Sequence, residues 1–308
     1  MIVCLGTTPV LQRSMVFDRV TPDGVNRATA VYDYASGKSP NVARVLHTLG
    51  EPVTAVGFAG GDRGAAFLRD LDAAGIVHGF VNVAAPTRQC VTVIDRSAGT
   101  ATELVEESTP VTPGDWERLY ELIDALLPDA TGLVLSGSLP PGAPQDFYLS
   151  CLRRTKGRAI PAVLDTRGEP LRLALGHDNF VAKLNREELA ATVGRELESD
   201  DDVLAAARVA APSGGAMVVT LGALGAIAVD ARGAWRVRVP RVATRSAVGS
   251  GDAFAAGLVA ELVRRQPLAE SCTLGSACGA ANAMTDLAGH LALEDVERIR
   301  PQVRVEPL

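Results

Sequence analysis

The sequence predicts an α/β protein with a mostly parallel sheet covered by helices on both faces. Short apolar segments alternate along the chain with segments whose apolar residues recur at helical spacing. Strands that are apolar throughout are typical of parallel sheets buried on both faces. The chain has 308 residues, of which 47% are hydrophobic and 21% charged, so it is long enough for a full core and has a globular composition.

The elements follow in order from these patterns. The first strand is expected at Ile2–Leu5, and the first helix at 41–49, where the apolar residues form one stripe that Gly50 ends. A later helix begins with Pro113 at its first position. Further strands are expected at 53–58, 133–135, 162–164, 180–181 and 217–220, and further helices from about 67, at 252–265 and at 268–285.

Two segments in the first third break this alternation. Residues 13–34 and 88–105 are typical of paired strands with no helix between them. We interpret them as one small β appendage, formed by insertions at about 10–35 and 86–107, on a single domain that covers residues 1–308.

Charge and cysteine content narrow the partners and the compartment. With 30 Lys and Arg against 36 Asp and Glu, the net charge of -6 disfavours nucleic acid or an anionic membrane as the main partner, although a few cations suffice for a small anionic substrate. Five cysteines without a CxxC pair indicate free thiols in a reducing cytosol. The four histidines form no metal signature, and no signal peptide or membrane span is evident, so we expect a cytoplasmic protein.

The strongest local signal is AVGSGDAF, from Ala247 to Phe254, which leads directly into an apolar helix. Glycines before a helix let backbone N–H groups point at an anion, and the helix dipole adds attraction. Asp252 is suited to accept a proton from a hydroxyl that attacks a phosphate. On this motif alone, an ordinary glycine loop with Asp252 as a helix cap is equally good.

Three other loops contain glycine. SGKSPN at 36–41 puts Lys38 before a helix but is not a P-loop. SGSLPPG at 136–142 follows a strand, and the segment 220–226 closes another strand with two glycines that allow a ligand to approach closely. Each loop also has a plain structural interpretation. The first could be a turn with an exposed lysine, the second a connection rich in glycine and proline, and the third a tight hairpin.

The segment AKLNREEL contains Asn185 and Glu188, which share a helix face. An amide and a carboxylate there could hold water-bound Mg²⁺. For an isolated NxxE pair, a helix cap plus a surface acid is the better interpretation. Taken together, however, these loops lie at the ends of predicted parallel strands, where α/β proteins bind ligands.

In this order, the motifs resemble those of the PfkB (ribokinase-like) carbohydrate kinases over nearly the whole chain. GSGDAFAAGL resembles the C-terminal signature of the family, SGKSPNVARVL its N-terminal GGKGxNVAR signature and AKLNREEL its KPNxxEL stretch, and SGSLPPG and TLGALGA also match. The chain is most similar to the phosphosugar branch of tagatose-6-phosphate kinase and 1-phosphofructokinase. Two segments, Thr87–Cys90 and Val25–Arg27, resemble tagatose-6-phosphate kinase in particular.

The resemblance implies a three-layer α/β/α sandwich with the small sheet as a lid, and a role for each matching residue. Asp252 would be the catalytic base, and the amides of Gly249, Ser250 and Gly251 would form an anion hole. Glu188, with Asn185, would order Mg²⁺. The ATP site would be lined by Lys183, Asn185, Thr220, Gly222, Gly225 and Asn282. The sugar phosphate would be bound by Gln12, Arg27, Gly37, Lys38, Asn41, Arg88, Ser138 and Asp252.

Three positions depart from the family pattern. The family's NPxxD aspartate, which holds sugar hydroxyls, is Gln12 here, which still accepts a hydrogen bond but carries no charge. Ser39 adds a side chain where the backbone should come close to the sugar, and Leu184 replaces a proline with little expected effect. The first two changes affect the choice of sugar and not the phosphoryl chemistry.

We therefore expect an ATP- and Mg²⁺-dependent kinase of a ketohexose monophosphate, of the tagatose 6-phosphate or fructose 1-phosphate type. We base the choice of a phosphorylated substrate on Arg88 and Lys38, the two cations expected to bind its phosphate. Two alternatives stay open: a kinase of a non-phosphorylated sugar or nucleoside, and a sugar- or nucleotide-binding regulator that has lost catalysis. A homodimer through the lid is an expectation from the family alone.

Overall fold

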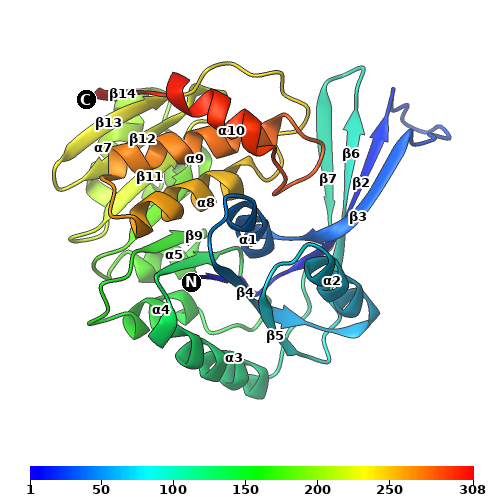
Figure 1. Ribbon diagram of the computed structural model, residues 1–308, viewed down its shortest axis with the longest axis horizontal. Helices are drawn as coiled ribbons and strands as arrows, with labels where there is room; N and C mark the ends of the chain where they lie inside the picture. Colours follow the sequence, from blue (N-terminus) through cyan, green and yellow to red (C-terminus); the bar gives the residue numbers. More distant parts are fainter.

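The computed structural model describes residues 1–308 and contains two separate sheets (Figure 1). The larger sheet has ten strands in the order β14-β13-β12-β11-β10-β9-β8-β1-β4-β5. The strands from β5 through β11 in this order run parallel, and β12, β13 and β14 extend the sheet antiparallel. Their bounds are β1 (Ile2–Leu5), β4 (Val53–Ala59), β5 (His78–Asn82), β8 (Gly132–Ser136), β9 (Ala162–Asp165), β10 (Val181–Asn185), β11 (Ala216–Thr220), β12 (Ala226–Asp230), β13 (Gly233–Arg238) and β14 (Arg304–Pro307).

Helices cover both faces of this sheet, because successive strand residues are buried in different cores. Cys4 of β1 belongs to one hydrophobic cluster, and its neighbours Val3 and Leu5 belong to the other. The first cluster is completed by α1 (Lys38–Thr48), α2 (Gly61–Ala73), α8 (Ser250–Val263), α9 (Leu268–Ala283) and α10 (Leu293–Ile299). The second is completed by α3 (Pro113–Leu126), α4 (Phe147–Arg154), α5 (Glu169–Ala174), α6 (Arg186–Val193) and α7 (Asp200–Ala210).

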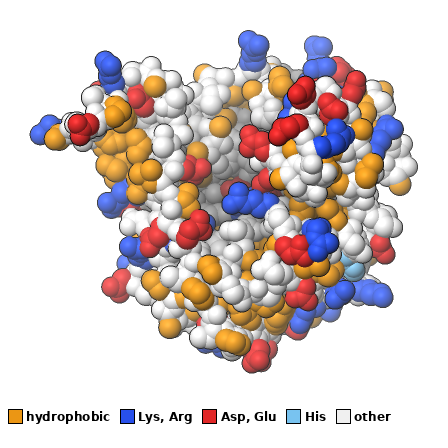
Figure 2. All heavy atoms as spheres, turned by 180° about the vertical axis from the view of Figure 1, so that it is seen from behind, with side chains coloured by type: hydrophobic (Ala, Val, Ile, Leu, Met, Phe, Trp, Pro, Cys, Tyr) orange, Lys and Arg blue, Asp and Glu red, His pale blue; other side chains and the backbone are white.

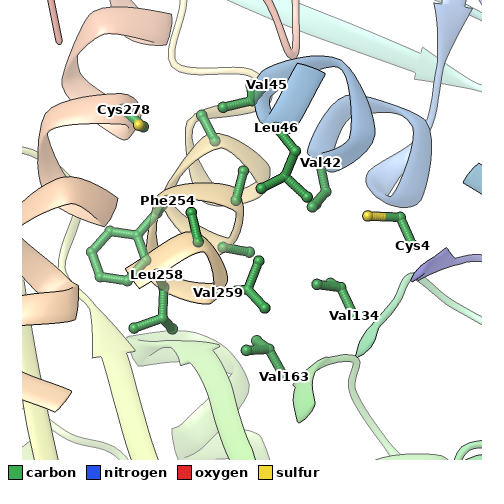
Figure 3. Close-up of a cluster of buried hydrophobic side chains, with 14 of the residues drawn as sticks. Cys4, Val42, Val45, Leu46, Val134, Val163, Phe254, Leu258, Val259 and Cys278 are labelled. Carbon is green, nitrogen blue, oxygen red and sulfur yellow. The ribbon is translucent and has the colours of Figure 1, made fainter. Parts of the chain in front are cut away.

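The packing of α1 against α8 fixes the part of the fold that carries the strongest motifs. Val42, Val45 and Leu46 of α1 lie close to Leu258 and Val259 of α8 within one buried cluster (Figure 3). All residues of α8 from Asp252 to Glu261 are buried. Because the helix is enclosed in this way, its first turn is held in place relative to the start of α1.

The second sheet has four strands, β2 (Val10–Phe17), β3 (Ala30–Ser36), β6 (Arg88–Asp95) and β7 (Thr100–Val105), in the order β3-β2-β6-β7. Two antiparallel pairs, β2 with β3 and β6 with β7, are joined by parallel pairing of β2 with β6. The sheet stands out to one side of the larger one (Figure 1). The predicted fold class, a mostly parallel sheet with a small separate sheet, is confirmed.

Some boundaries differ from those predicted. The strand expected at 180–181 extends to Asn185, because Leu184 is buried and pairs with Val219 of β11. Lys183 therefore lies within a strand and not in the loop after it. The segment after β11 is a tight antiparallel hairpin with a short 3-10 turn (Gly222–Leu224), which was the plain alternative for this motif. None of the helices has the length and apolar character needed to cross a bilayer.

Candidate active site

The candidate site lies where β8, β9 and β10 end and where α1 and α8 begin. Asp165 is the last residue of β9, Asn185 the last of β10, and Lys38 the first of α1. One face of the molecule is hollowed between the small sheet and the larger part, and basic and acidic side chains both border the hollow (Figure 2). This is the edge at which parallel α/β sheets bind ligands.

Asp252 lies in the first turn of α8 and is 8% exposed. The Asn41 Nδ2 amide donates to Asp252 Oδ2 at 2.7 Å, and Ser36 Oγ donates to Asn41 Oδ1 at 2.9 Å. Burial raises the pKa of Asp252 to about 6, although Lys38 and the Asn41 hydrogen bond pull it down. A carboxylate with this pKa is a better proton acceptor than an ordinary aspartate and is still mostly ionised at neutral pH. Both polar ends of the Asn41 side chain are thus engaged in orienting Asp252.

The turn before α8 fits an anion. Gly249 has φ 81°, and a Cβ there would lie 2.7 Å from Ala288, so only glycine is accommodated. Of the three predicted amides, that of Ser250 already donates to Ala247 O at 3.1 Å. The first-turn amides of Gly251 and Asp252 have no partner within the helix, and Ser250 Oγ is buried without a hydrogen bond. These groups are donors left over for a phosphate.

Asp165 is a functional candidate that our sequence analysis missed. Its buried carboxylate accepts hydrogen bonds from Lys38 Nζ and, at 2.6 Å, from Lys183 Nζ. Burial alone raises the pKa of Asp165, but the two ammonium groups outweigh it and lower the pKa to about 2. The available signal was an aspartate directly after the apolar run 162–164, at the carboxyl end of a strand.

Lys38 and Lys183 lie close to the acidic residues of the candidate site and to the first turn of α8. The pKa of Lys38 is raised because Asp165, Glu188 and Asp252 outweigh its burial. Lys183 is buried beside the first turn of α8, since a Cβ at Gly251 would lie 3.3 Å from Lys183 Nζ. Two cations therefore lie between the carboxylate of Asp252 and the start of α6.

Asn185 and Glu188 form a reciprocal helix cap at the start of α6. Asn185 Oδ1 accepts from the Glu188 amide and Glu188 Oε2 accepts from the Asn185 amide, both at 2.8 Å. The cap leaves Glu188 Oε1 at 3.8 Å from Lys38 Nζ. Because no three His, Cys, Asp or Glu side chains are grouped as a metal site, Mg²⁺ here would use Glu188 Oε1, water and substrate oxygens, which is the coordination that this ion accepts.

The predicted sugar side is built around Thr8. Arg88 Nη2 donates to Thr8 O at 3.3 Å, while Thr8 Oγ1 donates to Ser138 O at 3.2 Å. The Nε of Arg88 is buried without a partner. Gly37, the residue before α1, lies against this segment, since a Cβ there would lie 3.2 Å from Pro9 Cα. Gln12 is buried on the small sheet, where its Nε2 donates to Thr92 Oγ1 at 2.9 Å.

Two expectations about this side are not met. The Ser39 side chain does not enter the site, because it is buried in the core and Oγ donates to Cys4 O at 2.7 Å. Arg27 lies in the exposed connection between β2 and β3, and its side chain forms no hydrogen bond or ion pair with the other predicted residues. Within this single chain, it is not brought to the site.

The predicted nucleotide residues divide into two groups. Thr220 Oγ1 donates to Leu184 O at 3.3 Å, and Gly222 and Gly225 shape the hairpin after it, with φ 58° and 93°. Asn282 is instead fully buried: Nδ2 donates to Val248 O at 3.0 Å, and Oδ1 accepts from the Gly289 amide at 2.8 Å. Its side chain fastens the turn before α8 to the loop after α9 and is not available to a nucleotide.

Comparison with known proteins agrees with this geometry. The family model described as pfkB family carbohydrate kinase matches residues 1–292, so the chain belongs to that family. It is therefore a phosphotransferase with a hydroxyl acceptor, and its family implies ATP as the donor.

Three solved structures illustrate the similarity. Escherichia coli phosphofructokinase-2 in complex with substrates and products is 29% identical, with a TM-score of 0.89 and 98% of each chain covered. A Staphylococcus aureus protein described as a candidate phosphofructokinase is 30% identical, with a TM-score of 0.81 over 100% of this chain and 99% of that one. A Thermotoga maritima protein described as a possible 1-phosphofructokinase shares the fold, with a TM-score of 0.91, 24% identity and coverage of 100% and 99%.

Proposed function

We propose that the protein transfers the γ-phosphoryl group of ATP, with Mg²⁺, to a hydroxyl of a ketohexose monophosphate of the tagatose 6-phosphate or fructose phosphate type. The observation that carries the proposal is the buried Asp252, oriented by Asn41, at a helix start whose remaining donors suit a phosphate. The phosphofructokinase neighbours support a phosphorylated sugar as the acceptor.

Each group then has a task in the reaction. Asp252 accepts the proton of the attacking hydroxyl. The amides of Gly251 and Asp252 and the Ser250 hydroxyl hold the transferring phosphoryl group as its charge redistributes. Lys38 and Lys183, which Asp165 positions, add positive charge on the side of the leaving group; Lys38, which the family resemblance assigned to the sugar phosphate, is given this role because it shares the Asp165 carboxylate with Lys183. Mg²⁺, when bound through Glu188, would neutralise phosphate charge.

The sugar end is assigned to Arg88 and Gln12. The unpartnered Nε of Arg88 leaves a charged donor for a substrate phosphate, and guanidinium binds phosphate strongly. Gln12 donates through Nε2 to Thr92, which leaves its amide oxygen to accept from a sugar hydroxyl.

A coupled assay of ADP release over a panel of sugars and sugar phosphates tests the proposal. We expect turnover on a ketohexose monophosphate, with Asp252→Ala lowering kcat by about 10²- to 10⁴-fold while Mg·ATP still binds. Turnover retained in that variant would remove Asp252 as the base. If no member of the panel is turned over, the protein is a binding protein and not a kinase of this class.

One observation favours a second candidate, a kinase of a non-phosphorylated sugar. Glu103 of β7 lies close enough to Arg88 for the two charges to interact, so the positive charge of Arg88 is partly offset. Arg88→Ala separates the two candidates. For a phosphosugar kinase it raises the KM of the sugar phosphate, and for the second candidate it leaves the KM of every accepted substrate unchanged.

We also propose that two copies of the chain pair through the small sheet. Its polar side chains, including Gln12, Ser14 and Thr92, face the main body and are buried. Its other face carries apolar side chains around one ion pair, Arg13–Asp33: Val31 is 49% and Leu104 56% exposed, beside Met15, Val91 and Val93. Hydrophobic side chains gather on this projecting part (Figure 2). A second copy covering this face would remove it from water, and one structure of Escherichia coli phosphofructokinase-2 is described as a tetrameric inhibited form.

A further inference from the structure

A cavity of about 480 Å³ opens beside the metal end of the candidate site. It is lined by Asn185 and Glu188 of the α6 cap, by Glu187, and by two arginines, Arg167 and Arg172. Glu188 belongs to both the cavity and the site, because its Oε1 lies 3.8 Å from Lys38 Nζ. The cavity therefore continues the site on the side away from the small sheet.

The two arginines of this cavity differ in whether their guanidinium groups are paired with a carboxylate. The Arg172 guanidinium is held by Glu169 through two hydrogen bonds, at 2.7 Å from Nε and 2.6 Å from Nη2. Arg167 follows Asp165 by two residues, in the turn from β9 to α5, and its guanidinium forms no hydrogen bond and no ion pair. Its charge is the free one at the cavity.

The side chains already assigned to the site carry a net negative charge, which one more cation would balance. Asp165, Glu188 and Asp252 outnumber Lys38 and Lys183 by one, and both lysines face the same Asp165 carboxylate. The charge of Glu187 adds to this excess at the cavity. A magnesium nucleoside triphosphate is itself anionic. A free guanidinium, with several donors in a planar fork, is the group that would make this cavity favourable for phosphate oxygens.

We propose that Arg167 binds the polyphosphate chain of the nucleotide in this cavity, on oxygens that are not transferred. The inference rests on the proposed function, in which a nucleoside triphosphate is the donor. Arg167 then contributes to the affinity for Mg·ATP and has no part in sugar recognition.

Isothermal titration calorimetry with Mg·ATP and with adenosine, without any sugar, tests this inference on the full chain. Arg167→Ala should weaken Mg·ATP binding by about tenfold and flatten its dependence on salt, with adenosine binding unchanged. Arg167→Lys should fall between the wild type and Arg167→Ala. Arg172→Ala is the matched control, since it lines the same cavity with its charge already paired, and should bind Mg·ATP within about twofold of the wild type.

Several results would overturn the inference. They are Mg·ATP affinity unchanged in Arg167→Ala, an equal loss in Arg172→Ala, an equal loss of adenosine binding, or no binding of Mg·ATP by the wild type. Thermal unfolding of each variant checks that the loss is not one of folding. Because sugar is absent, the result is separable from the proposed function: Arg167-dependent binding with no turnover on any sugar phosphate would refute the proposed function and leave this inference standing.

Discussion

The hydrogen bonds from Ser36 to Asn41 and from Asn41 to Asp252 influence the pKa of Asp252, the residue that we propose as the base. The pKa of Asp252 is raised to about 6 by burial, whereas the hydrogen bond from Asn41 favours the ionised form. Since only the ionised carboxylate accepts a proton, kcat should fall as the pH decreases through about 6.

In Asn41→Ala, the acid limb of the kcat profile should move to higher pH, because a hydrogen bond to the ionised carboxylate is lost. We also expect kcat at its optimum to fall by about tenfold or more, which corresponds to one hydrogen bond of about 1.4 kcal/mol. The measurement is kcat from pH 5 to 9. His290→Gln is the control, because His290 is the nearby group that ordinarily titrates in this range. A limb that moves with His290 and not with Asn41 would contradict the assignment.

Asp165 is the residue on which the charge arrangement of the site depends. Asp165→Asn leaves Lys38 and Lys183 without their shared carboxylate, and an uncompensated buried charge costs about 3–5 kcal/mol. Urea unfolding at pH 7 should show a loss of this order. Glu306→Gln, which removes the partner of Arg238 in an exposed ion pair outside the small sheet, should cost less than about 1 kcal/mol. Equal losses in the two variants would refute the central role of Asp165.

The interaction of Asp165 with Lys38 and Lys183 also predicts how the stability of the fold changes with pH. The pKa of Asp165 in the folded state, about 2, is below its ordinary value of 3.8. Its contribution to stability is therefore present above the unfolded value and is lost as the pH falls through about 2.

At the scale of elements, the loop between α9 and α10 contacts both the small sheet and the turn before α8. Arg96, in the turn between β6 and β7, donates to both carboxylate oxygens of Asp286 at 2.6 Å, and Tyr34 OH of β3 accepts from the Ala288 amide at 3.1 Å. Ala288 in turn packs on Gly249. The turn before α8 is therefore packed against a loop that the small sheet itself holds in place.

Gly249→Ala tests this arrangement. The new Cβ would meet both an unfavourable φ of 81° and Ala288 at 2.7 Å, so we expect a loss of stability of more than about 2 kcal/mol and a large loss of kcat. Gly142→Ala is the matched control, since Gly142 has φ 76° but no atom within 4 Å of the added Cβ. If both variants unfold at the same urea concentration, the contact with Ala288 contributes nothing.

The order of the elements could be predicted from the sequence, whereas several side-chain contacts of the candidate site could not. The α8 helix and the NxxE cap follow from local rules, because their signals lie within a few residues of one another. The partners of Asp165 come from β10 and α1, and the direction of Ser39 depends on the backbone of β1. Such contacts depend on how distant segments pack, which a motif does not encode.

For the whole molecule, the testable feature is the apolar outer face of the small sheet. If the proposed dimer forms, Leu104→Asp should shift it towards monomer in light scattering coupled to size exclusion, because a carboxylate would be buried in the interface. Val209→Asp is the control, since Val209 is 86% exposed on α7, outside the small sheet. A wild type that is monomeric at all concentrations would refute the dimer.

The Asn41–Asp252 hydrogen bond joins residues 211 positions apart, and its consequence concerns synthesis. While a ribosome makes the chain, α1 emerges long before the helix against which Val42, Val45 and Leu46 pack (Figure 3). Until α8 has been translated, this apolar stripe lacks its partner helix and Asp252, the proposed base, is not yet part of the chain. The candidate site of a nascent chain is therefore completed only late in translation, and during that interval the apolar stripe of α1 is exposed to aggregation.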